Sequence, residues 1–253
     1  MNILEKILDV KRQEVQQIQD IGFGEMVGQK CSLKDALSKP GISVIAEIKM
    51  KSPSEGEILP NANPVQIAKD YESAGAAAIS VLTDQQFFGG SLDILKAVRK
   101  AVFIPVIRKD FIIDEKQISE TVHYNGDAFL LIADALDQDA LQQLMNVGKK
   151  AGLEFLVEYH AEKHAEFIFV LNPKIVGINC RNLKTMTTNI SYFEKMISSL
   201  PSNSVKVAES GIYTSDDLKY VSELGYDAAL IGTSLMKTGN PGKALETLIG
   251  GLS

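Results

Sequence analysis

The sequence repeats one local pattern, in which a glycine ends a helix-like segment and a short apolar run follows within a few residues. The pattern occurs at Gly75, Gly126, Gly152 and Gly225, in the segments AGAAAISVLT, NGDAFLLIAD, AGLEFLVEYH and LGYDAALIGT. Glycine is favoured there because the residue after the last helical turn often adopts a left-handed conformation. The four glycines lie close to multiples of one spacing, so a single strand-and-helix unit is expected to recur along the chain.

Four further apolar runs raise the number of strand candidates to eight. They span residues 42–48, 103–109, 173–179 and 205–210, so strands are expected to begin near residues 44, 77, 105, 128, 154, 175, 205 and 228. Segments with apolar residues at helical spacing separate the strands. These amphipathic segments are 64–74, 92–101, 114–123, 139–150, 162–171, 190–200 and 215–224.

Strands that alternate with helices indicate an α/β protein with a parallel sheet and right-handed crossovers. Eight such units within 253 residues predict a closed (β/α)8 TIM barrel, for which a length of about 250 residues is typical. An open doubly wound sheet is the second choice, because no G-x-G-x-x-G turn follows the first strand. No linker or low-complexity tract interrupts the sequence, so residues 1–253 are expected to form a single barrel domain.

Residues 1–40 precede the first strand and are expected to form an N-terminal helical extension. Residues 3–19 predict a charged amphipathic helix that turns one side inward, with Ile3, Ile7, Val10 and Val15 on that side. The segment SLKDAL predicts a second short helix with Ser32 as its N-cap. Two interpretations stay open, because the extension could cover one mouth of the barrel or form a surface helix or dimer contact.

The charge composition excludes several classes of function. The chain has 26 basic and 32 acidic residues and a net charge of −6, so no basic surface for nucleic acid or an anionic membrane is expected. No apolar run approaches the roughly 18 residues of a membrane span, and the charged first residues argue against a signal peptide. Cys31 and Cys180 cannot form a disulfide framework. We expect a soluble cytoplasmic protein that is a monomer, with a dimer as the alternative.

Charged side chains stand at the carboxyl ends of several predicted strands, the end of a barrel that carries the active site. Glu47 and Lys49 share a face because side chains alternate along a strand. A common pocket is therefore expected for Glu47, Lys49, Lys109, Glu158 and Glu209. Mixed charges of this kind shift one another's pKa values and suit proton transfer. The alternative, in which each charge points to water, is weakened because a barrel brings its strand ends together.

Small residues follow the seventh and eighth strands, at Ser210-Gly211 and Gly232-Thr233. Barrels often bind phosphate at this place, where backbone N–H groups face the ligand. The sequence therefore predicts a phosphorylated small molecule as ligand. Phe88, just past the second strand, is equally consistent with core packing and with the wall of a pocket for an apolar ring.

Eight segments combine these residues into longer motifs in a fixed order. They are Ala46–Lys49 with Ser52-Pro53-Ser54, SVLTDQQFFGGS (80–91), PVIRKDFI (105–112), LLIADAL (130–136), LVEYH (156–160), VGINCRNLKT (176–185), VKVAESGI (205–212) and LIGTSLM (230–236). Together they resemble the indole-3-glycerol phosphate synthase family, and they cover the chain after the leading helices. The combination of RKDFI, GIN-x-RNL and AESGI is highly specific.

The resemblance implies a decarboxylating lyase of tryptophan biosynthesis. Such an enzyme closes the pyrrole ring of 1-(2-carboxyphenylamino)-1-deoxyribulose 5-phosphate, with loss of carbon dioxide and water, to give indole-3-glycerol phosphate. No metal or organic cofactor is needed in the family.

The resemblance also implies roles for matching residues. Lys109 corresponds to the general acid that protonates the ketone oxygen, and Lys49 to the lysine near the anthranilate carboxylate, which also serves in dehydration. Two carboxylates that move protons during the loss of water correspond to Glu158 and Glu47. The polar residues around the ribulose hydroxyls correspond to Asn179 and Glu209.

The remaining matches concern substrate binding. Arg181 corresponds to the arginine that binds the substrate carboxylate. The phosphate cradle corresponds to Ser52, Ser210, Gly211, Gly232 and Thr233. The aromatic side chains around the anthranilate ring correspond to Phe88 and Phe111.

The chain departs from the family pattern at few positions. Cys180 stands where asparagine is common, Met50-Lys51 lies in a variable loop, and residues 89–91 are rich in glycine. None of these departures removes a residue that was assigned a role.

Two other functions compete with the synthase. A phosphoribosylanthranilate isomerase would have a cysteine at the end of its first strand, where this chain has Glu47-Ile48-Lys49. A non-catalytic barrel that only binds phosphorylated ligands would be expected to lose its proton-transfer groups, whereas Lys49, Lys109 and Glu158 are all present.

Overall fold

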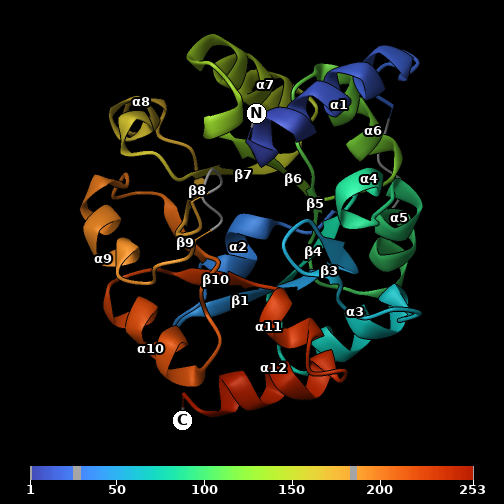
Figure 1. Ribbon diagram of the computed structural model, residues 1–253. Helices are drawn as coiled ribbons and strands as arrows, with labels where there is room; N and C mark the ends of the chain where they lie inside the picture. The colour runs from blue at the N-terminus through green and yellow to red at the C-terminus, as the bar shows by residue number, and fades with distance from the viewer. Residues whose placement is uncertain (1, 25–29, 183–186, 253) are drawn as a thin grey trace.

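Eight parallel strands form a closed barrel in the computed structural model, which describes residues 2–24, 30–182 and 187–252 (Figure 1). The first barrel strand pairs with the second and with the last, through Ile45 beside Ala78 and Ser43 beside Ala228. The strands are β1 (Ser43–Ile48), β4 (Ala78–Leu82), β5 (Val106–Lys109), β6 (Ala128–Ile132), β7 (Glu154–Tyr159), β8 (Ile175–Asn179), β9 (Val205–Glu209) and β10 (Ala228–Ile231). The predicted (β/α)8 barrel is confirmed, and each strand begins within one residue of its predicted start.

Helices surround the barrel on its outside (Figure 1). The longer ones are α3 (Pro64–Ser73), α5 (Leu92–Ala101), α6 (Glu115–His123), α7 (Gln138–Lys150), α8 (Ala165–Leu171), α10 (Ser215–Glu223) and α12 (Pro241–Gly250). Two predicted helices are broken, because residues 162–171 form the 3-10 turn η2 (Glu162–His164) before α8, and residues 190–200 form α9 (Tyr192–Met196) and η3 (Ile197–Ser199). In the described residues, no helix has the length and apolar character needed to cross a lipid bilayer.

Short elements fill the loops at the carboxyl ends of the strands. A two-strand hairpin, β2 (Lys51–Ser52) with β3 (Gly56–Glu57), follows β1. The helix α4 (Gln85–Phe88) follows β4, the turn η1 (Ala133–Ala135) follows β6, and α11 (Thr233–Met236) follows β10. These loops lie at the end of the barrel where its site is expected.

The repeated glycine has the predicted conformation at three of its four positions. Gly75, Gly152 and Gly225 have φ values of 95°, 69° and 95°. At the fourth position Asn125 takes the left-handed conformation instead, with φ 60°. Gly126 is still needed there, because a Cβ atom would lie 2.8 Å from Cγ2 of Thr121.

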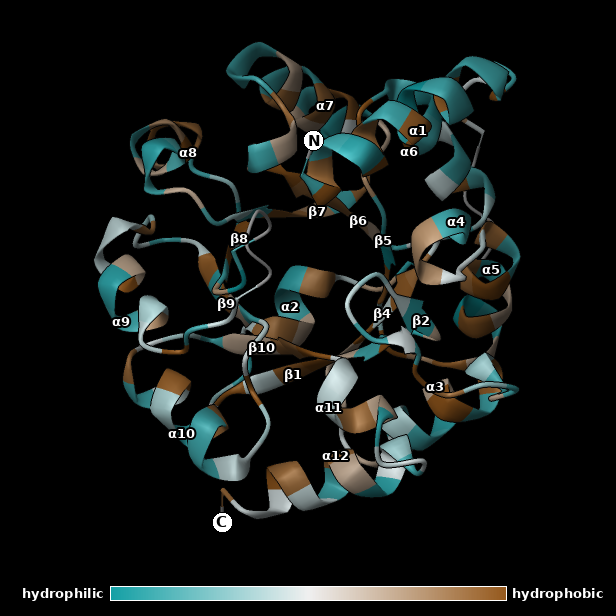
Figure 2. Ribbon diagram, viewed as in Figure 1, coloured by the Kyte–Doolittle hydropathy of each residue, from teal (hydrophilic) through white to brown (hydrophobic). Residues whose placement is uncertain are grey.

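Buried apolar side chains form two layers, as the alternation along each strand requires. The inner layer fills the barrel and includes Ile45, Ile107, Leu130, Leu156 and Val207. The outer layer lies between strands and helices, and includes Val44, Ile79, Phe129, Val157 and Ala208. Figure 2 shows the hydrophobic residues along the strands and on the sides of the helices that face them.

The two leading helices lie at opposite ends of the barrel, so only part of the extension covers the mouth of the site. The helix α2 (Leu33–Leu37) packs Leu33 and Leu37 against the inner layer, and the side chain of its predicted N-cap, Ser32, accepts from the N–H of Asp35. The backbone N–H of Lys34 donates to Glu154, the first residue of β7, at 3.0 Å. The helix α2 therefore closes the amino-terminal end of the barrel and is visible in its centre in Figure 1.

The helix α1 (Ile3–Gln17) lies at the carboxyl-terminal end instead. Its buried residues are Ile7, Leu8, Lys11 and Val15. Ile7 and Val15 were predicted to face inward, and both are buried. Val10 was also predicted to face inward but is only partly buried, whereas Leu8 and Lys11 are buried. A lysine is therefore part of the inward face of this helix.

Candidate active site

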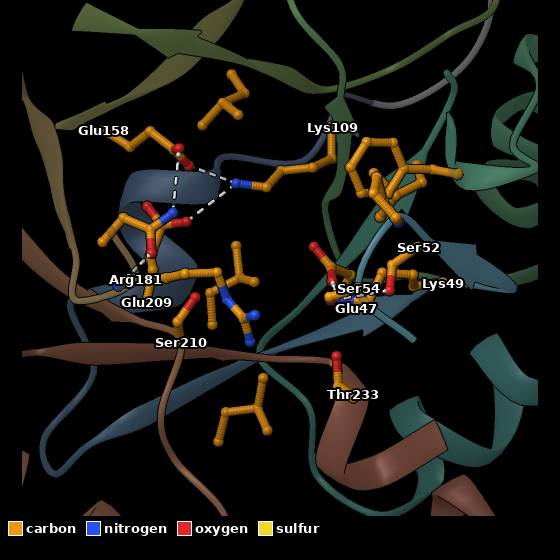
Figure 3. Close-up of a pocket in the computed structure, with 18 of the residues that line it drawn as sticks. Glu47, Lys49, Ser52, Ser54, Lys109, Glu158, Arg181, Glu209, Ser210 and Thr233 are labelled. Carbon is orange, nitrogen blue, oxygen red and sulfur yellow. Dashed lines mark hydrogen bonds and ion pairs between the residues drawn. The ribbon is translucent and has the colours of Figure 1, made fainter. Parts of the chain in front are cut away.

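One pocket lies at the carboxyl ends of the barrel strands, and every site residue predicted from the sequence lines it (Figure 3). The predicted residues in its wall are Glu47, Lys49, Ser52, Phe88, Lys109, Phe111, Glu158, Asn179, Arg181, Glu209, Ser210, Gly211, Gly232 and Thr233. Their convergence follows from the parallel strands, since all eight end at the same side of the barrel. Residues 183–185, the end of the motif at 176–185, lie outside the described residues.

Lys109 stands between two buried carboxylates. Its Nζ atom lies 2.5 Å from Oε2 of Glu158 and 3.0 Å from Oε2 of Glu209 (Figure 3). The side chains of the two glutamates are only 4% and 2% exposed. Asn179 Nδ2 lies 3.4 Å from the second oxygen of Glu158. The three ionisable groups come from β5, β7 and β9, so alternate strands of the barrel build the cluster.

The protonation of this cluster follows from its surroundings. Burial alone would lower the pKa of Lys109, but attraction to Glu158 and Glu209 raises it well above its ordinary value. Burial and repulsion from Glu158 raise the pKa of Glu209, against the attraction of Lys109. Burial would also raise the pKa of Glu158, but Lys109 and hydrogen bonds lower it. Lys109 is therefore a cation near neutral pH, and of its two carboxyl partners Glu209 holds its proton to a higher pH than Glu158 does.

A second ion pair lies across the pocket. Lys49 Nζ is 2.8 Å from Oε1 of Glu47, and both side chains are largely buried. Gly232 makes space for this carboxylate, because a Cβ atom at Gly232 would lie 2.5 Å from Oε1 of Glu47. In Figure 3 this pair lies beside Ser52 and Ser54, on the side of the pocket away from Glu158. The pocket thus offers two separate lysine–carboxylate pairs for proton transfer.

The loops after β9 and β10 form a polar cradle. Ser210 and Gly211 follow β9 and both have left-handed backbones, with φ values of 71° and 73°. Gly232 precedes α11, whose first residue is Thr233. The N–H groups of a first helical turn have no acceptor within their helix, so they are available to a phosphate. Ser54 and Ser234 also line the pocket, which the sequence prediction missed.

The side chain of Cys180 packs against the Ser210-Gly211 part of this cradle. Its Sγ lies 3.3 Å from the backbone oxygen of Ser210, and a Cβ atom at Gly211 would lie 2.9 Å from that sulfur. Burial raises the pKa of the Cys180 thiol to about 12. The thiol is therefore neutral near pH 7 and is not a nucleophile, as the sequence indicated.

Another part of the pocket wall is apolar. The rings of Phe88 and Phe111 lie 6.1 Å apart between centroids. Phe88 thus contributes to the pocket, which decides between the two interpretations left open for it. Ile3, Leu4 and Ile7 of α1 also line the pocket, and no motif pointed to them. The pocket therefore joins an apolar end to a charged centre and a polar cradle.

Asp110 lines the pocket, and it was not predicted as a site residue; nor were two buried charged residues near it, Lys11 and Asp84. Lys11 of α1 forms ion pairs with Asp84 and Asp110, at 3.0 and 2.9 Å. The sequence carries a signal for this arrangement, because Ile7, Lys11 and Val15 are spaced four residues apart and share one face of a helix. Among the described residues, no group of three or more His, Cys, Asp or Glu side chains has a metal-binding arrangement.

The fold and this pocket define a (β/α)8-barrel protein with a charged pocket at the carboxyl ends of its strands. A solved structure of N-acetylmannosamine-6-phosphate 2-epimerase from Clostridium perfringens has the same fold, with a TM-score of 0.62 over 85% of this chain and 95% of the other. The two sequences are only 13% identical, so the likeness concerns the fold alone.

Sequence comparisons identify the family. The family model for indole-3-glycerol phosphate synthase matches residues 4–248. An indole-3-glycerol phosphate synthase of Halalkalibacterium halodurans is 44% identical, over 98% of this chain and 97% of the relative. One from Geobacillus sp. is 46% identical, over 93% and 92% of the two chains. The chain belongs to the indole-3-glycerol phosphate synthase family, whose members are decarboxylating lyases of tryptophan biosynthesis.

Proposed function

We propose that the pocket closes the pyrrole ring of 1-(2-carboxyphenylamino)-1-deoxyribulose 5-phosphate and releases indole-3-glycerol phosphate, carbon dioxide and water. The roles of the residues are assigned from the position of Lys109, a cation that lies between Glu158 and Glu209 in the pocket wall. Family membership selects this reaction over that of phosphoribosylanthranilate isomerase.

Lys109 is the general acid of the ring closure. The ring carbon that carries the carboxylate attacks the C2 ketone of the ribulose chain, and a new carbon–carbon bond forms as the ketone oxygen takes a proton. The raised pKa of Lys109 means that the free enzyme holds this proton at neutral pH. The buried carboxylate of Glu158 stabilises the ammonium and fixes its direction.

Arg181 and Lys49 bind the carboxylate of the substrate. Both line the pocket and carry positive charge, and in Figure 3 the Arg181 guanidinium points toward the centre of the pocket. They hold the carboxylate until the carbon–carbon bond to it breaks. The electron pair of that bond then returns to the ring and restores its aromaticity as carbon dioxide leaves.

Glu158 and Glu47 move the protons of the dehydration. The hydroxyl group formed at C2 leaves as water after it is protonated, and a proton is lost from C1 to complete the pyrrole. Each carboxylate is paired with a lysine, so that an acid and a base are available on both sides of the substrate. Asn179 and Glu209 hydrogen-bond the ribulose hydroxyls.

The two ends of the substrate bind to the two ends of the pocket. The phosphate group binds in the cradle of Ser52, Ser210, Gly211, Gly232 and Thr233. The anthranilate ring lies against Phe88 and Phe111, in the apolar part. Four further properties remain predictions. They are a cytoplasmic location, a monomeric state, a single domain over residues 1–253 and a reaction without metal or organic cofactor.

The test is turnover of the carboxyphenylamino substrate by the purified chain, followed through indole fluorescence. The chain contains no tryptophan, so its own fluorescence background is low. We expect activity that withstands a chelator and falls by at least about 100-fold in Lys109→Ala, as for other general acids. Lys219→Ala, at a side chain 65% exposed, is the control. A folded wild-type chain that binds inorganic phosphate but does not turn over the substrate would instead support the non-catalytic barrel.

A further inference from the structure

Lys11 is a buried cation that none of the proposed catalytic steps uses. Its side chain is 4% exposed although it belongs to α1, which lies outside the barrel. Its Nζ atom lies 2.9 Å from Asp110, 3.0 Å from Asp84 and 2.7 Å from Glu14. A lysine with three acidic neighbours at such distances is a built feature of the fold, since an unpaired buried charge is strongly unfavourable.

The charge states of this cluster are fixed by the same contacts. Burial would lower the pKa of Lys11, but Asp110 and Asp84 raise it above its ordinary value. Burial would raise the pKa of Asp110, but Arg108 and Lys11 lower it to about 2. Oδ2 of Asp84 has no hydrogen-bond partner among the described residues, so its attraction to Lys11 at 3.0 Å is electrostatic.

Each aspartate is bound to the chain segment that carries one aromatic residue of the pocket. Asp84 is the N-cap of α4, and its Oδ1 accepts from the N–H of Phe87 at 2.7 Å. Phe88 is the last residue of that helix. Asp110 accepts from the N–H of Phe111 at 2.9 Å. One ammonium group therefore joins the two loops that carry Phe88 and Phe111.

The acid–base centre is held by other contacts. Lys109 is adjacent to Asp110 in sequence, but its side chain is bound by Glu158 and Glu209 on the inside of the barrel. The phosphate cradle is attached to β9 and β10. Loss of the Lys11 charge should therefore affect the apolar end of the pocket more than its chemistry or its cradle.

We propose that Lys11 is a positioning residue, which holds the loops after β4 and β5 together and so fixes the positions of Phe88 and Phe111 in the wall against which the substrate ring lies. The inference rests on the proposed function, because it assigns the ring of the anthranilate moiety to this wall. Lys11 acts through Asp84 and Asp110 and does not itself touch the reacting atoms.

The test compares Lys11→Met, which keeps most of the apolar stem, with the wild-type chain. We expect KM to rise by about 10-fold or more while kcat changes by less than about 3-fold, because uniform binding is lost and the chemistry is retained. The inhibition constant of inorganic phosphate should not change. Lys11→Arg, which keeps the charge, should restore most of the lost affinity. Arg12→Met removes an exposed cation of the same helix and is the matched control.

A double variant separates positioning from a general loss of stability. In a Phe88→Ala background the Lys11→Met substitution should raise KM by less than about 3-fold, because the wall that Lys11 positions is already missing. Equal effects in both backgrounds, or an unchanged KM in a folded Lys11→Met chain, would overturn the proposal. If Lys11→Met does not fold, Asp84→Asn keeps the helix cap and removes the ion pair; an unchanged KM in that variant would likewise overturn it.

The activity of the wild-type chain distinguishes a failure of this inference from a failure of the proposed function. If the wild type has no activity, the proposed reaction is wrong, and titration with anthranilate still measures the apolar end of the pocket. We then expect anthranilate to bind the Lys11→Met chain at least about 10-fold more weakly than the wild type. Equal binding of anthranilate by the two chains would overturn the role of Lys11.

Discussion

Gly177 and Glu209 lie on neighbouring strands, and the missing side chain of Gly177 is the space that the Oε1 atom of Glu209 occupies. A Cβ atom at Gly177 would overlap this oxygen. Gly232 and Glu47 have the same relationship, since Gly232 follows β10 and Glu47 belongs to the adjacent β1. Glu209 and Glu47 thus each depend on a glycine in or directly after the neighbouring strand, because the barrel interior is otherwise filled by side chains.

Gly177→Ala should therefore impair catalysis, although Gly177 has no side chain that could take part in the reaction. The added methyl group displaces Glu209, so Lys109 loses one of its two carboxylates. We expect kcat to fall by about 10- to 100-fold and the free energy of unfolding to fall by about 1–3 kcal/mol. Steady-state kinetics and urea denaturation measure the two effects. Gly250→Ala, an exposed helical glycine with nothing within 4 Å of its added Cβ, is the control.

The raised pKa of Glu209 should make part of the stability depend on pH. Above its ordinary value of 4.5 the unfolded chain has lost this proton, whereas the folded chain keeps it up to its raised pKa. Stability therefore falls as the pH rises through this window, by at most about 1.4 kcal/mol per pH unit. The pKa of Glu158 is lowered, so the ionisation of Glu158 changes the stability only below pH 4.5, outside this pH range.

Urea denaturation of the wild type and of Glu209→Gln, in steps from pH 4.5 to neutrality, tests this. Glutamine cannot ionise, so the stability of the wild type should decline relative to that of the variant as the pH rises. Glu223→Gln, at a side chain 66% exposed, should keep the wild-type profile. Parallel curves for the wild type and Glu209→Gln would show that Glu209 is ionised in the folded chain.

Gly211→Ala should weaken phosphate binding. Gly211 has φ 73°, and its added Cβ would lie 2.8 Å from Thr188 and 2.9 Å from the sulfur of Cys180. The backbone strain amounts to about 1–3 kcal/mol and distorts the loop that faces the phosphate. We expect a higher inhibition constant for inorganic phosphate. Gly41→Ala has the same kind of backbone cost, with φ 85° and an open surrounding, and should leave phosphate inhibition unchanged.

Leu37→Ala should reduce stability and leave the reaction intact. Leu37 is fully buried in the inner layer, at the amino-terminal end of the barrel. The cavity should lower the free energy of unfolding by about 2–5 kcal/mol. Well below the melting temperature, kcat and KM should match the wild type, because the pocket lies at the other end. Phe103→Ala, at a side chain 90% exposed, should have little effect on either property.

Local patterns were sufficient to predict the barrel. Each strand is a short apolar run, and each unit carries its own helix and turn, so the eight strand positions could be predicted without any long-range information. The residues of the pocket could be predicted for a related reason. Lys109, Glu158 and Glu209 are far apart in sequence, but a parallel barrel brings the ends of their strands together.

What the sequence missed depends on distances between separate elements. The spacing of Lys11 with Ile7 and Val15 places it on the inward face of its helix, but the ammonium of a lysine on such a face usually reaches solvent, so Lys11 was not expected among the buried residues. Nothing in residues 1–40 indicates that α1 and α2 lie at opposite ends of the barrel. The raised pKa of Glu209 could not be predicted either, because it depends on how close Glu158 and Lys109 lie.

The pairing of β1 with β10 also determines when the protein can finish folding during its synthesis. The first strand leaves the ribosome long before its last partner, and until then one of its edges has free N–H and C=O groups. The early helix α1 similarly waits for Asp84 and Asp110. Closure of the ring is thus a late, long-range step, and a nascent chain that stalls before residue 228 exposes both a strand edge and the side chains that fill the barrel.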